Sequence, residues 1–304
     1  MATKTSLAYR IHLHERGPAS ADRIKRNLKL DEVPKPHPQA GQVLVRMRAA
    51  ALNYRDLLVA TNDESYKGHT ITPLVPLADG AGTVESVSEA PGSPSKWKPG
   101  DRVTFAAGST WTSAEPGMDA ELDTTKMLGG GDMDGLLRQY VVADEDAVVR
   151  APEGLSFEEA AALGGAYATA WNALFGWYRP LKEGDVVVTQ GTRGVSTAVL
   201  QIAAAAGAKV IVLSSSPEKL EVAKQLGAAH GLDSKDPEWD TKVLELTAGR
   251  GADHVVDVVG ASTILRSLRA TRKGGFVSAV GFLGGSENHD DLIPEIVFGA
   301  KTGM

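Results

Sequence analysis

The stretch Asp185-Val-Val-Val-Thr-Gln-Gly-Thr-Arg-Gly-Val-Ser196 decides the fold of the second half of the chain. Its first five residues contain a short apolar run of three valines, which is typical of a strand buried on both faces of a parallel sheet. A glycine-containing turn over 190–196 follows, and an alanine-rich helix is predicted over 195–206. A strand, a tight turn and a helix in this order predict the opening of a βαβ unit.

Strands and helices continue to alternate after this stretch. Before it, Ser156-Phe-Glu-Glu159 is a capping box, and the alanine-rich run behind it predicts a helix that continues to Phe175. Alternating elements with nearly continuous Val, Ile and Leu strands predict a doubly wound parallel α/β sheet, covered by helices on both faces. The predicted strands are 185–189, 209–213, 230–232, 254–258 and 276–280.

The first half of the chain has a different pattern. It lacks helical periodicity and reads as short strands broken by Pro and Gly, such as 43–48, 84–87 and 102–105. The sequence therefore predicts two domains, a β-rich one over 1–155 and a nucleotide-binding one over 156–304. Residues 106–136 are expected to form a long loop.

Composition excludes several classes of protein. The 304 residues carry a net charge of −6 and include no cysteine, so disulfides, thiolate nucleophiles and cysteine-ligated zinc sites are excluded. No apolar stretch is long enough to span a bilayer, and the N-terminus lacks the apolar region of a secretory signal. We expect a cytoplasmic protein that acts on a small-molecule substrate, with neither nucleic acid nor membrane as a partner.

The turn over 190–196 predicts a dinucleotide phosphate site, because such sites carry Gly-x-Gly-x-x-Gly between the first strand and its helix. Only the first glycine, Gly191, is kept, while Arg193 and Ser196 replace the second and third. Arg193 leaves two interpretations open: it pairs with a cofactor phosphate, or the turn is structural in a domain that has lost tight cofactor binding. On the first interpretation the contacts to the cofactor come from Gly191, Thr192, Arg193, Gly194 and Val195.

The end of the second predicted strand indicates which cofactor is bound. An acidic residue there would bond a ribose hydroxyl and reject a 2′-phosphate. This chain has Ser214, Ser215 and Ser216 at that point, followed by Lys219. Hydroxyls and an ammonium group suit a phosphate, so Ser214, Ser215 and Lys219 predict NADP(H) rather than NAD(H), although Ser216 also fits a helix cap.

Six motifs occur in order along the chain: Ala51–Leu57, Pro73–Gly82, Trp97–Val103, Thr169–Leu174, residues 190–196 and Gly274–Val277. Together they resemble the medium-chain dehydrogenase/reductase superfamily, in its zinc-independent quinone-oxidoreductase-like and enoyl-reductase-like branch. The resemblance implies a GroES-like β-rich catalytic domain and a Rossmann domain, with a cleft between them where NADPH passes hydride to a conjugated carbonyl, enoyl or quinone-like molecule.

Zinc-dependent members of that superfamily carry metal ligands that this chain lacks. By resemblance, a cysteine stands where this chain has Asn53, a Gly-His-Glu where it has Ala78 before Asp79, and another cysteine where it has Gly165. The seven histidines form no recognised ligand spacing. We therefore expect no metal, and zinc-activated alcohol oxidation is disfavoured.

The resemblance also implies which residues surround the reacting groups. Asn53 and Tyr54 would lie at the cleft, where the Asn53 amide can donate to a substrate carbonyl. Tyr66 has a spacing similar to that of the tyrosine of enoyl-reductase relatives. It is the candidate proton donor, and solvent is the alternative source of the proton. Thr169 would lie near the nicotinamide, with Gly281, Phe282 and Leu283 closing over it.

The predicted sheet has five strands, whereas the resemblance implies six. The chain is expected to be truncated at its C-terminus relative to this family, which leaves the fifth strand at an uncovered edge and puts a homodimer through that edge in doubt. Together with Arg193, this keeps an alternative open: a non-redox protein that retains the fold as a binding module, or that catalyses a reaction without hydride.

Overall fold

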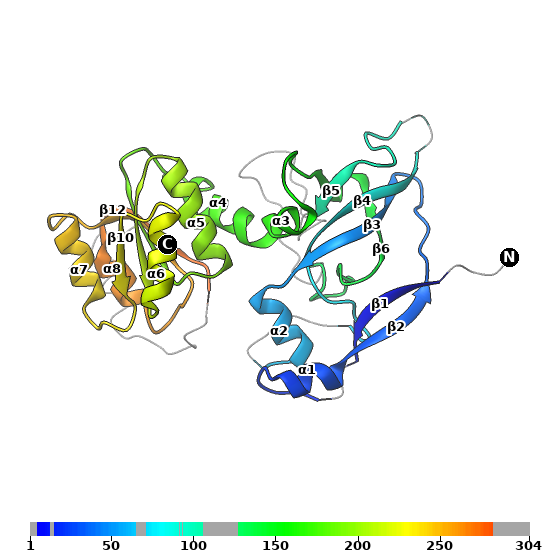
Figure 1. The fold of residues 1–304 in the computed structure, drawn as a ribbon, viewed down its shortest axis with the longest axis horizontal. Coiled ribbons are helices and arrows are strands. Elements are labelled where there is room, and N and C mark those ends of the chain that lie inside the picture. Colours follow the sequence, from blue (N-terminus) through cyan, green and yellow to red (C-terminus); the bar gives the residue numbers. More distant parts are fainter. Residues whose placement is uncertain are drawn as a thin grey trace. The chain divides into compact units, whose positions relative to one another are not determined.

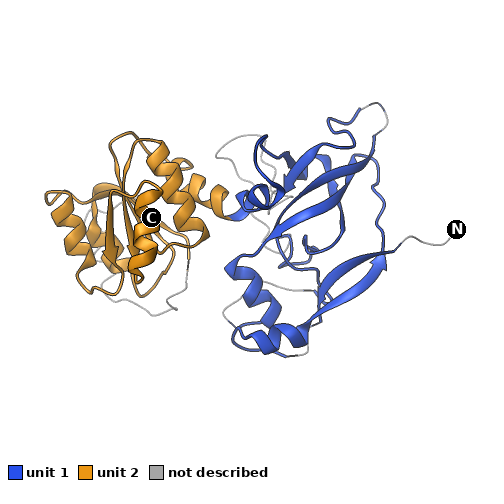
Figure 2. Ribbon diagram, viewed as in Figure 1, with its two compact units in different colours: residues 1–165 blue, residues 166–304 orange. Residues whose placement is uncertain are grey.

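The structure, a computed structural model, describes residues 5–12, 15–64, 71–90, 92, 94–105 and 127–281 (Figure 1). The chain divides into two compact units, residues 1–165 and 166–304 (Figure 2). This boundary lies later than the predicted 155/156 because helix α3 (Phe157–Ala161) packs on the sheet of the first unit. Ala160 and Ala161 of α3 are buried in one cluster with Ala81 of the first unit's sheet.

The first unit is rich in β-structure, as predicted. Its main sheet is antiparallel in the order β6-β3-β4-β5-β7, and its core contains Val45, Val103 and Val141. A separate ribbon, β1-β2, pairs the start of the chain antiparallel with residues 28–34. The strands are β1 (Thr5–Ile11), β2 (Leu28–Pro34), β3 (Gln42–Ala51), β4 (Asp79–Ser88), β5 (Arg102–Phe105), β6 (Tyr140–Asp144) and β7 (Val148–Arg150).

Two helices of the first unit correct the expectation that this half has none. They are α1 (Ala21–Asn27) and α2 (Tyr54–Thr61), of seven and eight residues. Helices of about two turns are too short for an apolar period to show in the sequence. Capping starts both of them: the Ser20 hydroxyl accepts the Arg23 N–H, and the Asp56 carboxylate accepts the Asn53 N–H.

The second unit contains the predicted parallel sheet in the order β10-β9-β8-β11-β12. Counted from the first strand of the unit this order is 3-2-1-4-5, which is the Rossmann arrangement over the five described strands. The strands are β8 (Val186–Gln190), β9 (Lys209–Ser214), β10 (His230–Asp233), β11 (Ala252–Asp257) and β12 (Thr271–Ala279).

Helices cover both faces of this sheet, because alternate strand residues point to opposite sides. Val187 and Val210 face one core, which α4 (Ala168–Phe175), α5 (Gly194–Ala205) and α6 (Pro217–Gln225) cover. Val188 and Ile211 face the other core, under α7 (Trp239–Leu246) and α8 (Ile264–Ala270). Within the described part of the chain, no helix is long and apolar enough to cross a bilayer.

The helix predicted from the Ser156 cap to Phe175 is interrupted. The capping box is confirmed, with Ser156 accepting the Glu159 N–H and Glu159 accepting the Ser156 N–H. α3 nevertheless ends at Ala161, and a π-helical turn over Leu163–Tyr167 separates it from α4. π-helical turns free backbone groups and often mark functional positions. Gly164 and Gly165, which lie in this turn, are therefore candidate functional positions.

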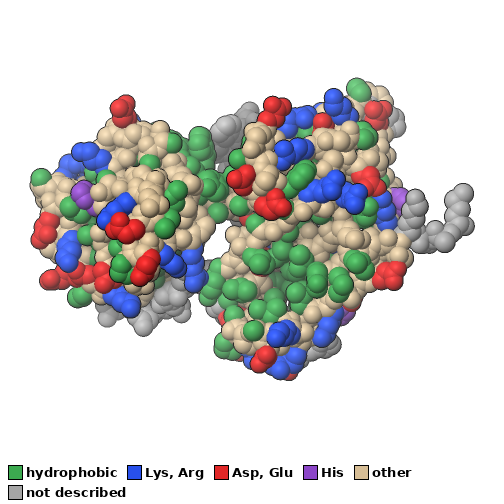
Figure 3. Space-filling view, viewed as in Figure 1, with side chains coloured by type: hydrophobic (Ala, Val, Ile, Leu, Met, Phe, Trp, Pro, Cys, Tyr) green, Lys and Arg blue, Asp and Glu red, His purple; other side chains and the backbone are tan. Residues whose placement is uncertain are grey.

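Surface charge is mixed in both units. On the face in Figure 3, acidic and basic side chains are interspersed without a large area of one sign, and apolar side chains gather over β1, β2 and α2. Exposed apolar residues of the ribbon are Leu7, Tyr9 and Leu30.

Candidate functional site

Asn53 and Asp79, 26 residues apart in the sequence, meet in the first unit. Asn53 precedes α2, and Asp79 is the first residue of β4. The Asn53 Nδ2 donates to Asp79 Oδ2 at 2.8 Å, and the Gly165 N–H donates to the same oxygen at 2.9 Å. By resemblance, Asn53 and Gly165 stand where zinc-dependent relatives carry cysteine ligands and Asp79 stands where they carry a glutamate, so the structure brings the predicted Asn53 to a hydrogen-bonded centre.

Space for the Asp79 carboxylate comes from two glycines of the π-helical turn. A Cβ placed on Gly165 would lie 2.6 Å from Asp79 Oδ2, and one placed on Gly164 would lie 2.7 Å from Oδ1. Carbon atoms do not approach oxygen so closely without displacement. The carboxylate therefore occupies a volume that side chains at 164 and 165 would otherwise fill.

Burial raises the pKa of both acids at this centre. Asp79 is 1 % exposed, and desolvation raises its pKa although Asn53 and Gly165 donate to it. Burial likewise raises the pKa of Asp56 to about 6, opposed by the Asn53 N–H and the Arg55 charge. One oxygen of each carboxylate, Oδ1, is buried without a hydrogen-bond partner among the described residues.

The two tyrosines predicted beside Asn53 have different outcomes. Tyr54, the first residue of α2, is exposed and follows Asn53 directly, so it lies on the surface beside this centre. Tyr66 lies outside the described residues, and its role as a proton donor stays a prediction.

The donors at this centre do not fit a zinc ion. Zinc sites take thiolates, imidazoles and carboxylates, whereas Asn53 offers an amide that is already bonded to Asp79, and Gly165 offers only its backbone. Over the described ranges, no three His, Cys, Asp or Glu side chains gather into a metal-binding group.

The second unit presents the predicted phosphate turn. Gly191 has φ of +80°, a left-handed conformation that suits glycine, and its N–H donates to the Leu213 carbonyl at 2.6 Å. Ser196, at the third glycine position, is buried and donates its hydroxyl to the Gln190 carbonyl at 2.5 Å. Ser196 thus ties the first turn of α5 to the end of β8, where a glycine would only allow close packing.

Arg193 does not enter the protein interior. It is the N-cap of α5, its backbone is extended, and its side chain is exposed without an ion pair to any described residue. The guanidinium at the second glycine position is thus available to an anion at the N-terminus of α5.

A pocket of about 220 Å³ lies beside this turn. Thr192 and Lys219 contribute polar groups to it, and Leu200 and Val222 contribute apolar ones. Lys219 is exposed and forms no ion pair within the described part of the chain. The other lining residues are Gly191, Ser196, Thr197, Val212, Ala223 and Leu226.

The three serines at 214–216, where β9 ends and α6 begins, have different roles. Ser214 is buried and accepts the Ser216 N–H at 3.3 Å, whereas Ser215 is exposed. Ser216 caps α6 by accepting the Lys219 N–H, as predicted, and donates to Glu218 at 2.7 Å. Glu218, in the first turn of α6, places an acid next to the predicted phosphate contacts.

The structure describes only some of the other residues that are predicted to contact the cofactor. Thr169 lies on α4 and is partly exposed. Gly281 follows β12, where a Cβ would come within 2.1 Å of the Val258 carbonyl. Phe282 and Leu283 lie outside the described residues.

Sequence reasoning missed the buried carboxylate of Asp257 at the end of β11. It is 0 % exposed and accepts the Ser267 hydroxyl at 2.6 Å, the Gly260 N–H at 2.8 Å and the Gln190 side chain at 3.1 Å. This network joins the ends of β8 and β11, where the strand order reverses and ligands bind in such sheets. The only signal in the sequence was an acidic residue at the C-terminal end of an apolar strand.

Comparison with known proteins agrees with both units. The family model described as an alcohol dehydrogenase GroES-like domain matches residues 39–153, and the one described as a zinc-binding dehydrogenase matches 194–301. A zinc-type alcohol dehydrogenase-like protein of Schizosaccharomyces pombe is 41% identical over 262 residues, which are 84% of this chain and 73% of that protein.

Solved structures share the same architecture. A putative alcohol dehydrogenase from Sinorhizobium meliloti superposes with a TM-score of 0.85 at 34% identity, over 100% of this chain and 84% of that one. The CurK enoyl reductase superposes with a TM-score of 0.74 at 26% identity, over 94% and 77% of the two chains.

A GroES-like unit joined to a Rossmann unit defines a class of oxidoreductases. The chain belongs to the medium-chain dehydrogenase/reductase superfamily, within its alcohol-dehydrogenase-like members.

Proposed function

We propose that this protein is a zinc-independent reductase that transfers hydride from NADPH to a conjugated carbonyl, enoyl or quinone-like small molecule. The observation that carries the proposal is the amide of Asn53, held by Asp79 where zinc-dependent relatives place a ligand. A neutral hydrogen-bond donor there suits a substrate oxygen that gains negative charge during reduction. The likeness to an enoyl reductase supports the substrate class.

The electron balance follows from this assignment. Bound NADPH would supply the hydride, which adds to the carbon β to the carbonyl. The electron pair of the double bond then shifts toward the carbonyl oxygen, where Asn53 donates a hydrogen bond. A proton from Tyr66 or solvent completes the reduction at the α carbon. Thr192 and the N-terminus of α5 would hold the pyrophosphate, and the exposed Arg193 would add a charge-assisted bond.

The preference for NADPH rests on the turn after β9. Lys219 lines the pocket beside the phosphate turn without a carboxylate partner among the described residues, and the Ser215 hydroxyl is exposed there. Both suit a 2′-phosphate. Glu218 opposes them in charge, but its carboxylate is held by Ser216.

Cofactor titration followed by nicotinamide fluorescence tests this preference. We expect NADPH to bind more tightly than NADH, and Lys219→Ala to weaken NADPH by roughly tenfold with little effect on NADH. Lys224→Ala is the matched control, because Lys224 lies on the same helix but pairs with Glu221. Equal loss for both cofactors would reject the 2′-phosphate contact, and no binding at millimolar cofactor would reject the reductase.

Arg193 supports a second candidate, a protein that keeps the fold without hydride transfer. Its side chain stands where a glycine normally lets the backbone approach the pyrophosphate. Arg193→Gly separates the two candidates. A reductase that uses the guanidinium loses NADPH affinity, whereas a protein that has abandoned the cofactor gains it.

A further inference from the structure

We propose that Asp79 is the positioning residue of this site: its carboxylate determines the direction in which the Asn53 amide presents its free N–H to the substrate. The inference rests on the proposed function, in which that amide bonds the substrate oxygen. Asp79 Oδ2 accepts from Asn53 Nδ2 at 2.8 Å and from the Gly165 N–H at 2.9 Å.

The second of these bonds defines the orientation of Asn53. A backbone N–H can only donate, so Gly165 requires Asp79 Oδ2 to be an acceptor. When Asp79 is ionised its oxygens can only accept, so the Asn53 group that faces the same oxygen is its NH₂ rather than its carbonyl. The usual ambiguity of an Asn side chain, which can be turned by 180°, is thereby removed.

The backbone around the Asp79 carboxylate packs closely against it and keeps it in place. Cβ atoms on Gly164 and Gly165 would come within 2.7 Å and 2.6 Å of its two oxygens, and the Gly165 Cβ would also lie 3.3 Å from Asn53 Nδ2. The carboxylate is thus packed against the backbone of the π-helical turn. Asn53 is held a second time through its own N–H, which donates to Asp56 Oδ2 at 2.7 Å.

One donor is left over at this centre. The Asn53 NH₂ has two N–H groups, of which Asp79 accepts one, and no described residue accepts the other. With backbone and side chain both held, the remaining N–H has a defined direction before substrate arrives. Preorganised donors of this kind stabilise developing charge without reorganisation during the reaction.

The test combines a spectroscopic measurement with kinetics. In the unaltered protein, NMR should show coupling through the hydrogen bond between the Asn53 side-chain nitrogen and the Asp79 carboxyl carbon, with two well-separated Asn53 amide protons. Asn53→Ser identifies these signals by removing them. This measurement needs neither substrate nor cofactor, and it holds even where an Asp79 variant fails to fold.

Three variants then distinguish a positioning role of Asp79 from a purely structural one. Asp79→Ala should lower kcat for a conjugated carbonyl about 10- to 100-fold and leave NADPH affinity unchanged. Asp79→Asn keeps a carbonyl oxygen for both N–H donors and should recover much of that loss. Gly165→Ala should match Asp79→Ala, because its Cβ displaces the carboxylate. Asp146→Asn, at an exposed acid of the same unit, is the control and should change nothing.

Each result has a defined meaning. Absence of the Asn53–Asp79 coupling, or unchanged kcat in a folded Asp79→Ala, would overturn the positioning role. Equal losses in Asp79→Asn and Asp79→Ala would also overturn it, because they would show that activity depends on the negative charge of Asp79 and not on an oxygen that accepts both N–H groups. If the coupling is present but the unaltered protein reduces no conjugated carbonyl, the positioning stands and the proposed function fails.

Discussion

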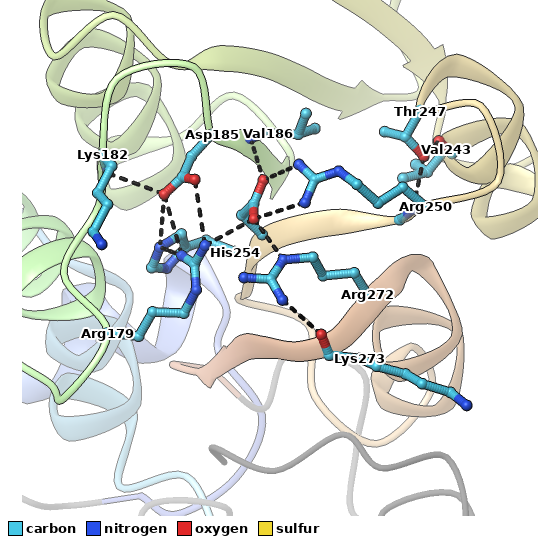
Figure 4. Close-up of polar contacts among 12 residues, drawn as sticks. Arg179, Lys182, Asp185, Val186, Val243, Thr247, Arg250, His254, Arg272 and Lys273 are labelled. Carbon is cyan, nitrogen blue, oxygen red and sulfur yellow. Dashed lines mark hydrogen bonds and ion pairs between the residues drawn. The ribbon is translucent and has the colours of Figure 1, made fainter.

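Stability of the second unit should fall as the pH is lowered, because of one buried histidine. His254 on β11 is 1 % exposed, and its Nε2 lies 2.7 Å from Arg179 Nη1 (Figure 4). A guanidinium only donates, so Nε2 must be the unprotonated acceptor. The other ring nitrogen, Nδ1, is buried without a described partner. Protonating this ring would cost the Arg179 bond and place a charge beside a cation.

The size of the effect follows from the pKa. Burial and the Arg179 charge lower the pKa of His254 from 6.5 to about 4, although Asp185 and Asp253 oppose the shift and Arg272 adds to it. Because the folded value is the lower one, the unfolded chain binds the proton first as the pH falls below 6.5. His254 therefore contributes stability at neutral pH that is lost between 6.5 and 4. The loss is about 2 kcal/mol by pH 5 and about 3 kcal/mol in full.

The assay is urea unfolding near pH 7.5 and near pH 5, followed by hydrogen exchange of the amides of β8 and β11. Exchange at these strands reports the second unit alone. His254→Gln keeps an oxygen that accepts from Arg179 but does not titrate, so the pH-dependent loss should shrink by about 2 kcal/mol. His230→Gln, at an exposed histidine on β10, should leave the loss unchanged. An equal pH dependence in His254→Gln and the unaltered protein would refute the reasoning.

Three further substitutions test the second unit. Gly191→Ala forces a left-handed residue and should cost about 1 to 2 kcal/mol in urea unfolding, more than Gly194→Ala; equal costs would contradict the strain. Ser196→Ala removes the bond to the Gln190 carbonyl and should cost about 1 kcal/mol, with Thr197→Ala as a neutral comparison. Asp253→Asn weakens a buried carboxylate bonded by Arg179, Arg250 and Arg272 and should cost about 3 kcal/mol; a calorimetric melt that does not shift would reject this.

The Rossmann unit was predictable because its signals are local. Strands β8, β9 and β11 contain short apolar runs, and the connections carry caps or glycines, such as Gly191 and the Ser216 cap of α6. Right-handed crossovers then leave few strand orders. The order 3-2-1-4-5 needs no knowledge of side-chain contacts.

The first unit was less predictable because its decisive contacts are remote in sequence. Asn53 was identified from its segment, but its partner Asp79 is 26 residues away and Gly165 is 86 residues beyond Asp79. No periodicity reports such a meeting. The break between α3 and α4 also has a local signal, because Gly164 and Gly165 are poor helix formers within the alanine-rich run. Its interruption coincides with the bond from Gly165 to a carboxylate on another element.

Two departures from the zinc-dependent pattern, Asn53 and Gly165, meet at the carboxylate of Asp79, which stands where that pattern carries a glutamate. An amide at Asn53 needs an acceptor, and Asp79 supplies it. The carboxylate needs space and a second donor, and the glycine at 165 supplies both, since any Cβ there would lie 2.6 Å from it. A cysteine at 165 would displace Asp79, and a cysteine at 53 would leave the buried carboxylate with one donor fewer, which is costly. Neither substitution alone leads from this arrangement back toward a metal site, so the residues at 53 and 165 are expected to change together or not at all.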